Sequence, residues 1–249
     1  MSEDFETLLV EELDDRTVVT LNRPEARNAI SGRMIAELHE VCARLEDDPK
    51  LLLLTGRGGV FAGGADIAEL LQRGAGEALQ GINSRLFERV RQLPLPTVAA
   101  VSGWALGGGA ELAYACDIRL ATPDAVFGNP EPGLGILAAA GACWRLSELV
   151  GASVAKQVLL AGRNLDASAA KAAGLVMEVV EADALLAEAH ALLDRMARSS
   201  AAALRMTKLV VNAPSGAHPI ADDLAQAVLF EGADKKDRMT RFLEKRSSK

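Results

Sequence analysis

The stretch TVAAVSGWALGGGAELAYACDIRLA, residues 97–121, decides the fold of this chain. Its first five residues form an apolar run and predict a buried strand. A glycine-rich turn follows, and residues 111–116 predict the helix that this turn opens. Residues 117–121 predict another strand. Because a strand, a helix and a strand follow one another, the sequence predicts an α/β core with parallel crossovers.

Further strands and helices are predicted on the N-terminal side of this stretch. The predicted strands are residues 17–21 and 51–55. The predicted helices are residues 31–46, 67–72 and 77–93, the last after a break at residues 74–76. Ser31 is the expected N-cap of the first helix, because its hydroxyl can accept a hydrogen bond from an unpaired backbone N–H.

The chain becomes mostly helical after Gly128. The predicted helices are residues 139–150, 152–161, 166–173, 183–197, 199–212, 219–230 and 234–245. Residues 175–180 predict one late strand between them. We therefore expect an α/β core over residues 1–182 and a helical C-terminal region over residues 183–249.

The charge balance excludes several classes of protein. With 27 Lys and Arg against 34 Asp and Glu, the net charge is −7, so no bulk positive field attracts nucleic acid or anionic lipid. The three cysteines contain no C-x-x-C pair, which argues against disulfides and zinc. The start of the chain lacks the pattern of a signal peptide, and the longest apolar run, residues 136–144, is too short to span a bilayer. We expect a cytoplasmic protein.

Common catalytic and nucleotide-binding motifs are missing. The Walker A and G-x-S-x-G patterns are absent, and a Rossmann-like G-x-G-x-x-A occurs only at residues 133–138, after a turn and not after a first strand. The three histidines, His39, His190 and His218, have no partners at ligand spacing. Histidine-based hydrolysis and metal catalysis therefore have little support.

Two glycine-rich turns each follow a predicted strand and open a predicted helix. They are GGAD at residues 63–66 and GGGA at residues 107–110. Backbone N–H groups at a helix N-terminus point outward without internal partners, and glycine allows close approach to them. Two such turns can aim two donors at one oxygen, as in an oxyanion hole. Each turn alone is better explained by tight packing, and only the pairing of the two turns in one α/β core makes a functional role competitive.

Two carboxylates lie in apolar or glycine-rich surroundings. Glu111 is in the first turn of the helix after GGGA, and Glu131 is in the sequence NPEP at residues 129–132. Glu111 can simply complement the helix dipole, and Glu131 can be a solvated turn residue. Burial in such surroundings would instead raise their pKa values and suit them to acid–base work on a shared water.

The motifs together resemble the enoyl-CoA hydratase/isomerase family, the crotonase superfamily, over essentially the whole chain. The central motif, residues 101–122, is highly specific. The stretches that carry the resemblance are LNRPEARNAIS (21–31), FAGGADI (61–67), VSGWALGGGAELAYACDIRLAT (101–122), FGNPEPGLGI (127–136), LLAGRNLDASAAKAAGLVMEVV (159–180) and RMTRFLEKR (238–246).

The resemblance implies a crotonase-like α/β spiral of ββα units with an α-helical C-terminal region that trimerises, often into hexamers. It implies an acyl-CoA thioester as substrate, with no metal or redox cofactor, because CoA arrives with the substrate. The thioester oxygen would accept hydrogen bonds from the backbone N–H groups of Ala65 and Gly108. The residues expected around substrate and CoA are Ala26, Arg27, Gly63, Gly64, Asp66 and Ile67.

The resemblance also implies catalytic roles for both glutamates. Glu111 would orient a water and accept its proton as the water attacks Cβ, while Glu131 would deliver a proton to Cα. Family isomerases often retain only the glutamate at the position of Glu131, so the pair favours a hydratase. An isomerase that moves a double bond, and a non-catalytic acyl-CoA-binding relative, stay open as alternatives.

The segment after Glu131 departs from the family pattern. A usual G-x-x-P-G-x-G-G-T-Q-R-L is here GILAAAGACWRL, residues 135–146. Residues 138–140 and Trp144 are therefore expected to reshape the acyl pocket, although Trp144 can also be a packed helix residue. The sequence leaves the acyl chain undefined.

Overall fold

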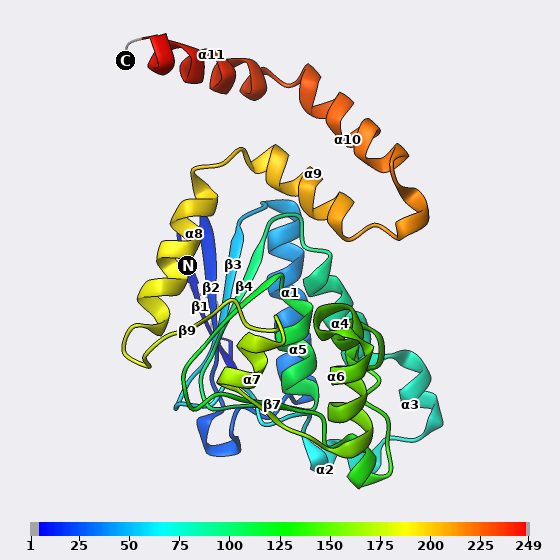
Figure 1. Cartoon of the computed structure of the whole chain (residues 1–249). Helices are drawn as coiled ribbons and strands as arrows, with labels where there is room; N and C mark the ends of the chain where they lie inside the picture. The colour runs from blue at the N-terminus through cyan, green and yellow to red at the C-terminus, as the bar shows by residue number, and fades with distance from the viewer. Residues whose placement is uncertain (1–4, 248–249) are drawn as a thin grey trace. The chain divides into compact units, whose positions relative to one another are not determined.

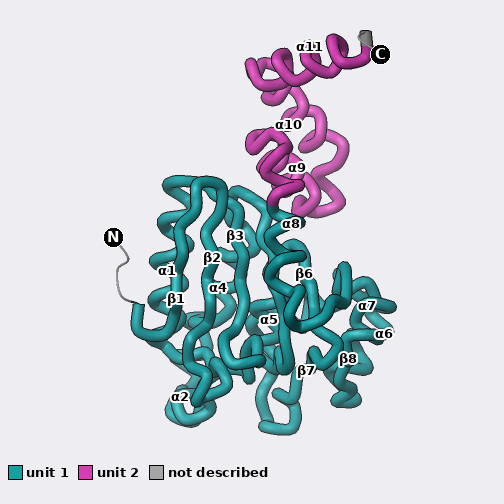
Figure 2. Tube along the Cα trace, turned by 90° about the vertical axis from the view of Figure 1, so that its left-hand side faces the viewer, with its two compact units in different colours: residues 1–193 teal, residues 194–249 magenta. Residues whose placement is uncertain are grey.

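The computed structural model describes residues 5–247 of the chain. It contains two compact units, residues 1–193 and 194–249, which Figure 2 distinguishes by colour. Helix α8, Leu185–Ala197, lies mostly within the first unit, although the sequence pattern grouped it with the helical C-terminal region. Among the described residues, no helix is long and apolar enough to cross a membrane.

A six-stranded sheet with the order β1-β2-β3-β4-β6-β9 forms the centre of the first unit. Its strands are β1 Leu8–Glu12, β2 Arg16–Leu21, β3 Leu51–Gly56, β4 Thr97–Val101, β6 Ile118–Ala121 and β9 Glu178–Val179. Every neighbouring pair is parallel except β1 with β2. Strands β3 and β4 are buried almost throughout, which explains their continuous apolar sequences. The predicted parallel α/β core is confirmed.

Helices cover both sides of this sheet. Figure 1 shows α1 Gly32–Asp47, α4 Ile82–Arg91 and α5 Gly108–Ala115 on one side and α8 on the other. The hydroxyl of Ser31 accepts a hydrogen bond from Met34 N at 3.3 Å, so the predicted N-cap of α1 is confirmed. The apolar face of α1 is buried, as its helical spacing predicts.

A second, three-stranded sheet positions the site. It consists of β5 Trp104–Leu106, β7 Val126–Gly128 and β8 Leu165–Asp166. Strands β5 and β7 are parallel, and Leu106 is in register with Gly128. Because parallel strands end at the same edge, the residues that follow them, Gly107 and Asn129, emerge side by side. The sequence pattern did not predict these short strands.

Other predicted elements differ in detail from those observed. The single helix expected over residues 77–93 is two helices, α3 Ala75–Gln80 and α4, because Gly81 between them has a left-handed backbone with φ of 62°. The late strand is only β9. Further helices of the first unit are α2 Ile67–Gln72, α6 Ser147–Ala161 and α7 Ala167–Ala172, with a π-helical turn over Ala142–Leu146. The predicted break near residue 151 is confirmed, because Gly151 has a non-helical backbone inside α6.

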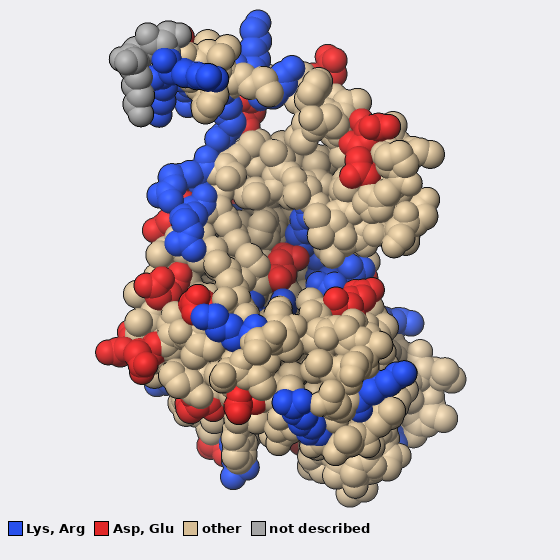
Figure 3. Space-filling model, in the orientation of Figure 1, with Lys and Arg blue, Asp and Glu red and all other residues tan. Residues whose placement is uncertain are grey.

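The second unit consists of helices in its described part. They are α9 Ala201–Val211, α10 Ile220–Glu231 and α11 Ala233–Ser247, with a 3-10 turn at Ser215–Ala217. Large apolar side chains on these helices are exposed, among them Leu209, Leu224, Phe230 and Phe242. Figure 3 shows basic side chains gathered over α11, whereas acidic and basic side chains are interspersed over the face of the first unit seen there.

Candidate active site

The first glycine-rich turn, residues 63–66, is held by a parallel bridge to Ile30. Ile30 N donates to Gly64 O at 2.8 Å, and Asp66 N donates to Ile30 O at 3.0 Å. In a parallel bridge these bonds flank the opposite residue, so the N–H of Ala65 faces away from Ile30. Gly64 has a φ of +123°, a conformation that L side chains rarely adopt. The turn therefore presents the Ala65 amide outward.

The second turn joins β5 to α5. Gly107 has a φ of +50°, and its N–H donates to Gly128 O at 2.8 Å. The N–H of Gly108, at the first position of α5, has no acceptor within its own helix. A Cβ on Gly109 would lie 2.3 Å from Ala62 O, so only glycine allows α5 to pack this closely.

These two turns adjoin one another. A Cβ built on Gly108 would lie 3.4 Å from Ala65 N, which places the two backbone segments in contact. The bridge between Ala62 and Ala105 ties the segments together just before the turns. Within the described residues, neither Ala65 N nor Gly108 N donates a hydrogen bond to another backbone or side-chain atom. The structure thus brings together the two amides that the sequence singled out.

Glu111 is buried in the first turn of α5, with 4% of its surface exposed. Its Oε1 accepts hydrogen bonds from Ala140 N at 2.8 Å and from Ala142 N at 3.0 Å. Burial raises the pKa of Glu111 to about 7, the hydrogen bond from Ala142 N opposes this rise, and the charge of Glu131 adds to it. This carboxyl can therefore exchange a proton near neutral pH.

Glu131 begins a short 3-10 turn, Glu131–Leu134, directly after Asn129-Pro130. It is 7% exposed, and burial raises the pKa of its carboxyl. Its Oε1 lies over the second turn, 2.9 Å from the position that a Cβ on Gly107 would take. Its Oε2 is buried and has no hydrogen-bond partner among the described residues. Only a glycine at position 107 leaves room for this carboxyl.

The structure therefore gathers both predicted glutamates and both predicted turns at the edge where β5 and β7 end. Glu111 and Glu131 are close enough for the charge of one to raise the pKa of the other. The Glu131 carboxyl adjoins Gly107 of the second turn, and that turn contacts the first. A buried carboxylate pair beside two backbone donors can add and remove protons next to a polarised carbonyl.

The residues expected to contact CoA surround the first turn. Ala26 ends a 3-10 turn, Pro24–Ala26, and the carbonyl of Arg27 accepts from Gly63 N at 2.8 Å. The Arg27 guanidinium lies over the Trp104 ring, 5.0 Å from its centroid. Gly63 lets this loop approach, since a Cβ there would lie 3.3 Å from Arg27 O.

Asp66 and Ile67 lie at the start of α2. Asp66 caps this helix by accepting from Ala68 N at 3.1 Å, and it pairs with Arg23 at 3.2 Å. Ile67 is 58% exposed. The side chain of Asp66 is thus engaged in local structure, whereas Ile67 presents an apolar surface beside the turn.

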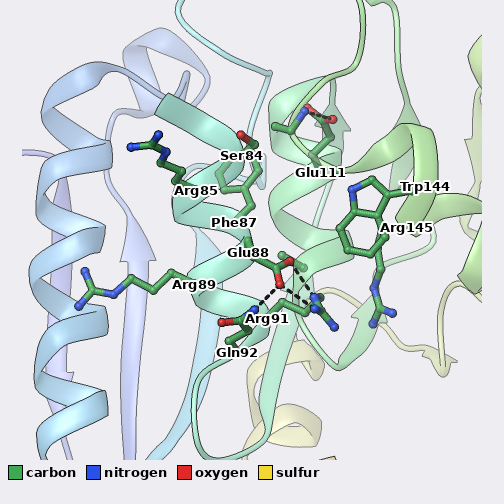
Figure 4. A pocket seen from close by; sticks show the side chains of 13 residues that line it. Ser84, Arg85, Phe87, Glu88, Arg89, Arg91, Gln92, Glu111, Trp144 and Arg145 are labelled. Carbon is green, nitrogen blue, oxygen red and sulfur yellow. Dashed lines mark hydrogen bonds and ion pairs between the residues drawn. The ribbon is translucent and has the colours of Figure 1, made fainter. Parts of the chain in front are cut away.

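A cavity of about 520 Å³ extends along one side of Glu111, between α4 and the π-helical turn. Figure 4 shows Trp144 and Arg145 on one wall and Glu88, Arg91 and Gln92 of α4 on the other. The Arg91 guanidinium lies over the Trp144 ring at 5.5 Å and pairs with Glu88 at 2.6 Å. The expectation that Trp144 contributes to a pocket agrees with this geometry.

Several residues of the site carried no sequence signal. The amides of Ala140 and Ala142 act through the backbone, so their side chains give no hint of their role. Trp104 lies in the short strand β5, which the sequence pattern did not predict, and Arg91 lies on α4, whose pattern indicates packing only. In the part of the chain that the structure describes, no group of three or more His, Cys, Asp or Glu residues is arranged to hold a metal ion.

One family profile and two curated proteins show sequence similarity to nearly the whole chain. The sequence profile described as "Enoyl-CoA hydratase/isomerase" matches residues 16–249. A Mycobacterium bovis protein named "Probable enoyl-CoA hydratase echA8" is 38% identical, covering 98% of this chain and 97% of its own length. A "Short-chain-enoyl-CoA hydratase" from Clostridium acetobutylicum is 36% identical, covering 98% and 97%. Both relatives extend over nearly the whole chain.

Solved structures agree with these sequence relatives. The crystal structure of an enoyl-CoA hydratase from Bacillus anthracis has a TM-score of 0.91 to this chain at 29% identity. The match covers 96% of this chain and 97% of that one. The likeness includes the helical C-terminal region as well as the α/β core, so the predicted crotonase-like fold is confirmed.

Proposed function

The chain belongs to the enoyl-CoA hydratase/isomerase family, and from that premise we propose that it is an enzyme that adds water across the 2,3 double bond of a 2-enoyl-CoA thioester. One observation carries the proposal. Two buried carboxyls, Glu111 and Glu131, stand beside the amides of Ala65 and Gly108, which point out of two adjoining turns. The names of the two sequence relatives support the same activity.

The backbone amides would polarise the thioester. Its carbonyl oxygen accepts hydrogen bonds from Ala65 N–H and Gly108 N–H, and negative charge gathers on that oxygen as water adds to Cβ. Fixed donors aimed at a developing oxyanion lower the barrier because they need no reorganisation during the reaction. The location of Gly108 at the first position of α5 adds the positive end of the helix dipole.

The two carboxyls would divide the proton transfers. Glu111 orients the water and takes its proton while the oxygen attacks Cβ, and Glu131 delivers a proton to Cα. Burial raises both pKa values, that of Glu111 to about 7, so near neutral pH the pair retains a proton. One coupled pair thereby supplies the base and the acid that hydration needs.

The positions of the CoA moiety and of the acyl group follow from placing the thioester oxygen at the two amides. The CoA moiety lies along the loop of Ala26 and Arg27 and the turn from Gly63 to Ile67. The acyl group beyond Cβ continues into the cavity that Glu111 lines. The reaction moves a water and a proton between the carboxyl pair and the substrate, so its chemistry requires no redox cofactor or metal ion.

We also propose that copies of this chain associate with one another through the second unit. The exposed apolar side chains of α9, α10 and α11 form a surface suited to contacts with further copies of the chain. A homotrimer, or a hexamer made of two trimers, would cover these side chains. Sedimentation of the intact protein at micromolar concentration measures this directly.

Product analysis tests the proposed activity. The wild type is incubated with crotonyl-CoA, and separately with a 3-enoyl-CoA, and the products are identified by mass spectrometry and NMR. We expect 3-hydroxybutyryl-CoA from the first substrate. Conversion of the 3-enoyl-CoA into a 2-enoyl-CoA, with no hydration of either substrate, would instead identify an isomerase.

A further inference from the structure

Three buried polar side chains lie next to one another at the proposed active site. Tyr114 on α5 is fully buried, Asn129 is 2% exposed and Glu131 is 7% exposed. The Tyr114 hydroxyl donates to Asn129 Oδ1 at 3.3 Å. A fully buried tyrosine hydroxyl needs a partner, and here the partner is the amide two residues before Glu131.

This hydrogen bond orients the Asn129 amide. Because Oδ1 accepts from Tyr114, the NH₂ group on the opposite side of Cγ is directed away from Tyr114. That nitrogen, Nδ2, is buried and has no partner among the described residues, and the same is true of Glu131 Oε2. Asn129 Nδ2 is thus a donor without an acceptor, and Glu131 Oε2, two residues later in the chain, is an acceptor without a donor. Buried polar atoms without partners are rare because they cost free energy. A hydrogen bond from Asn129 Nδ2 to Glu131 Oε2 would give both atoms a partner.

We propose that Asn129, oriented by Tyr114, is a positioning residue that donates a hydrogen bond to Glu131 Oε2 and thereby directs Oε1 toward the substrate. The inference rests on the proposed function of Glu131 as a proton donor. Oε1 is the oxygen that lies over Gly107, next to the Gly108 amide. With Oε2 held from behind, the carboxyl delivers its proton from Oε1 to Cα.

The Asn129 amide also influences the pKa of Glu131. The titratable groups that interact electrostatically with this carboxyl are Glu111 and Tyr114 from α5 and Cys143 from the π-helical turn, and none of these three is cationic. Burial raises the pKa of Glu131, and the Asn129 side chain lowers it. Loss of the amide would therefore raise the pKa of Glu131 further.

A purely structural role for Tyr114 makes different predictions. If the side chain only fills the core, Tyr114→Phe costs stability and nothing else. If it orients Asn129, then the substitution slows turnover through Glu131 and has no effect once Asn129 is already absent. The two possibilities are separated by kinetics and by a double-mutant cycle.

The experiment compares Tyr114→Phe, Asn129→Ala and the double variant with the wild type on crotonyl-CoA, and records kcat, KM and their pH dependence. Thr55→Val in β3 is the matched control, because it removes another buried hydroxyl, one that donates to Ala100 O of β4 at 2.9 Å. We expect kcat to fall about tenfold in Asn129→Ala, less in Tyr114→Phe, with KM within about twofold. The double variant should match Asn129→Ala, and Thr55→Val should keep the wild-type kcat.

The pH profile is a readout that would not change if Tyr114 and Asn129 had only a structural role. Because Glu131 acts as the proton donor, a higher pKa shifts the basic limb of the profile to higher pH in Asn129→Ala. An unchanged kcat and profile in both single variants, or additive losses in the double variant, would overturn the proposal.

A titration separates this inference from the proposed function. The carboxyl carbons are labelled, and the Glu131 signal is followed against pH by NMR in the wild type and in Asn129→Ala, with Glu131→Gln to assign it. If the wild type fails to hydrate 2-enoyl-CoA thioesters, the proposed function is wrong. A raised Glu131 pKa in Asn129→Ala still supports the contact, whereas an unchanged pKa refutes it.

Discussion

The surroundings of Glu111 and of Glu131 differ although the two carboxyls are almost equally buried, at 4% and 7% exposed. Oε1 of Glu111 is held by two backbone amides from the segment that precedes α6. Glu131 instead has one oxygen over Gly107 and the other without a partner. Donors around a carboxyl favour its charged form, and burial without donors favours the protonated form. Burial nevertheless raises the pKa of both carboxyls, so the difference concerns orientation: backbone donors hold Glu111 Oε1, whereas Glu131 Oε1 lies over the second turn.

The largest expected effect is loss of hydration when either carboxyl becomes an amide. Glu111→Gln and Glu131→Gln preserve side-chain shape but remove the acid–base function, so kcat with crotonyl-CoA should fall roughly 10²- to 10⁴-fold in each. Because the two groups act as a unit, the double variant should lose little more than either single one. CoA binding measured by calorimetry is the control and should be unchanged. A fully active Glu131→Gln variant would assign all proton transfer to Glu111.

The second prediction concerns stability against pH. The pKa of Glu111 is raised from 4.5 to about 7, so between these values the folded state binds a proton more tightly than the unfolded chain. The contribution of Glu111 to the free energy of unfolding should therefore fall as pH rises from 4.5 to 7. Glu111→Gln should remove this cost and stabilise the protein at pH 8 by up to about 3 kcal/mol. Urea unfolding at several pH values measures both trends, and a variant less stable than the wild type at pH 8 would contradict them.

A third prediction addresses the space beside Glu131. Gly107→Ala places a Cβ 2.9 Å from Glu131 Oε1 at a φ of +50°, and should lower kcat at least about tenfold by displacing the carboxyl. Gly59→Ala is the matched control, because its φ of +73° is similarly strained and its Cβ would meet nothing within 4 Å. It should lose stability but keep its turnover. Equal activity losses in both variants would mean that backbone strain, and not the contact with Glu131, is responsible.

The smallest effect is expected in the cavity beside Glu111. Trp144→Ala enlarges this cavity, so kcat/KM should shift toward longer acyl chains by about fourfold for each added methylene that the new space buries. Trp104→Ala, beside Arg27 and not among the cavity residues, should change the KM of all chain lengths alike. An unchanged chain-length profile in Trp144→Ala would place the acyl group elsewhere.

The parallel core was predictable because its strands are continuous apolar runs and its helices have regular spacing. Ser31 capping α1 and the glycines of residues 107–109 opening α5 follow from local chemistry that a sequence displays. The short strands β5, β7 and β8 were not predictable, because two or three residues carry no periodicity. Their pairing is what brings the turn at Gly107 beside Glu131.

The candidate site was predictable only in part for the same reason. Glu111, Glu131 and the two turns were identified from residue type and resemblance to a family. The amides of Ala140 and Ala142, which hold Glu111, act through the backbone and left no trace in the sequence. The orientation of Asn129 by Tyr114 depends on a contact between an α5 side chain and a loop residue, which spacing along the chain does not reveal.

The most direct test of the central claim follows the atoms of water into the product. The wild type is incubated with crotonyl-CoA in water carrying both heavy oxygen and deuterium, and the product is examined by mass spectrometry and NMR. The account predicts 3-hydroxybutyryl-CoA with one solvent oxygen on Cβ and one solvent deuteron on Cα, and no such product from Glu131→Gln at a comparable rate. Deuterium exchange into the substrate without any oxygen on Cβ would contradict it, and would show a carboxyl pair that moves protons but does not add water.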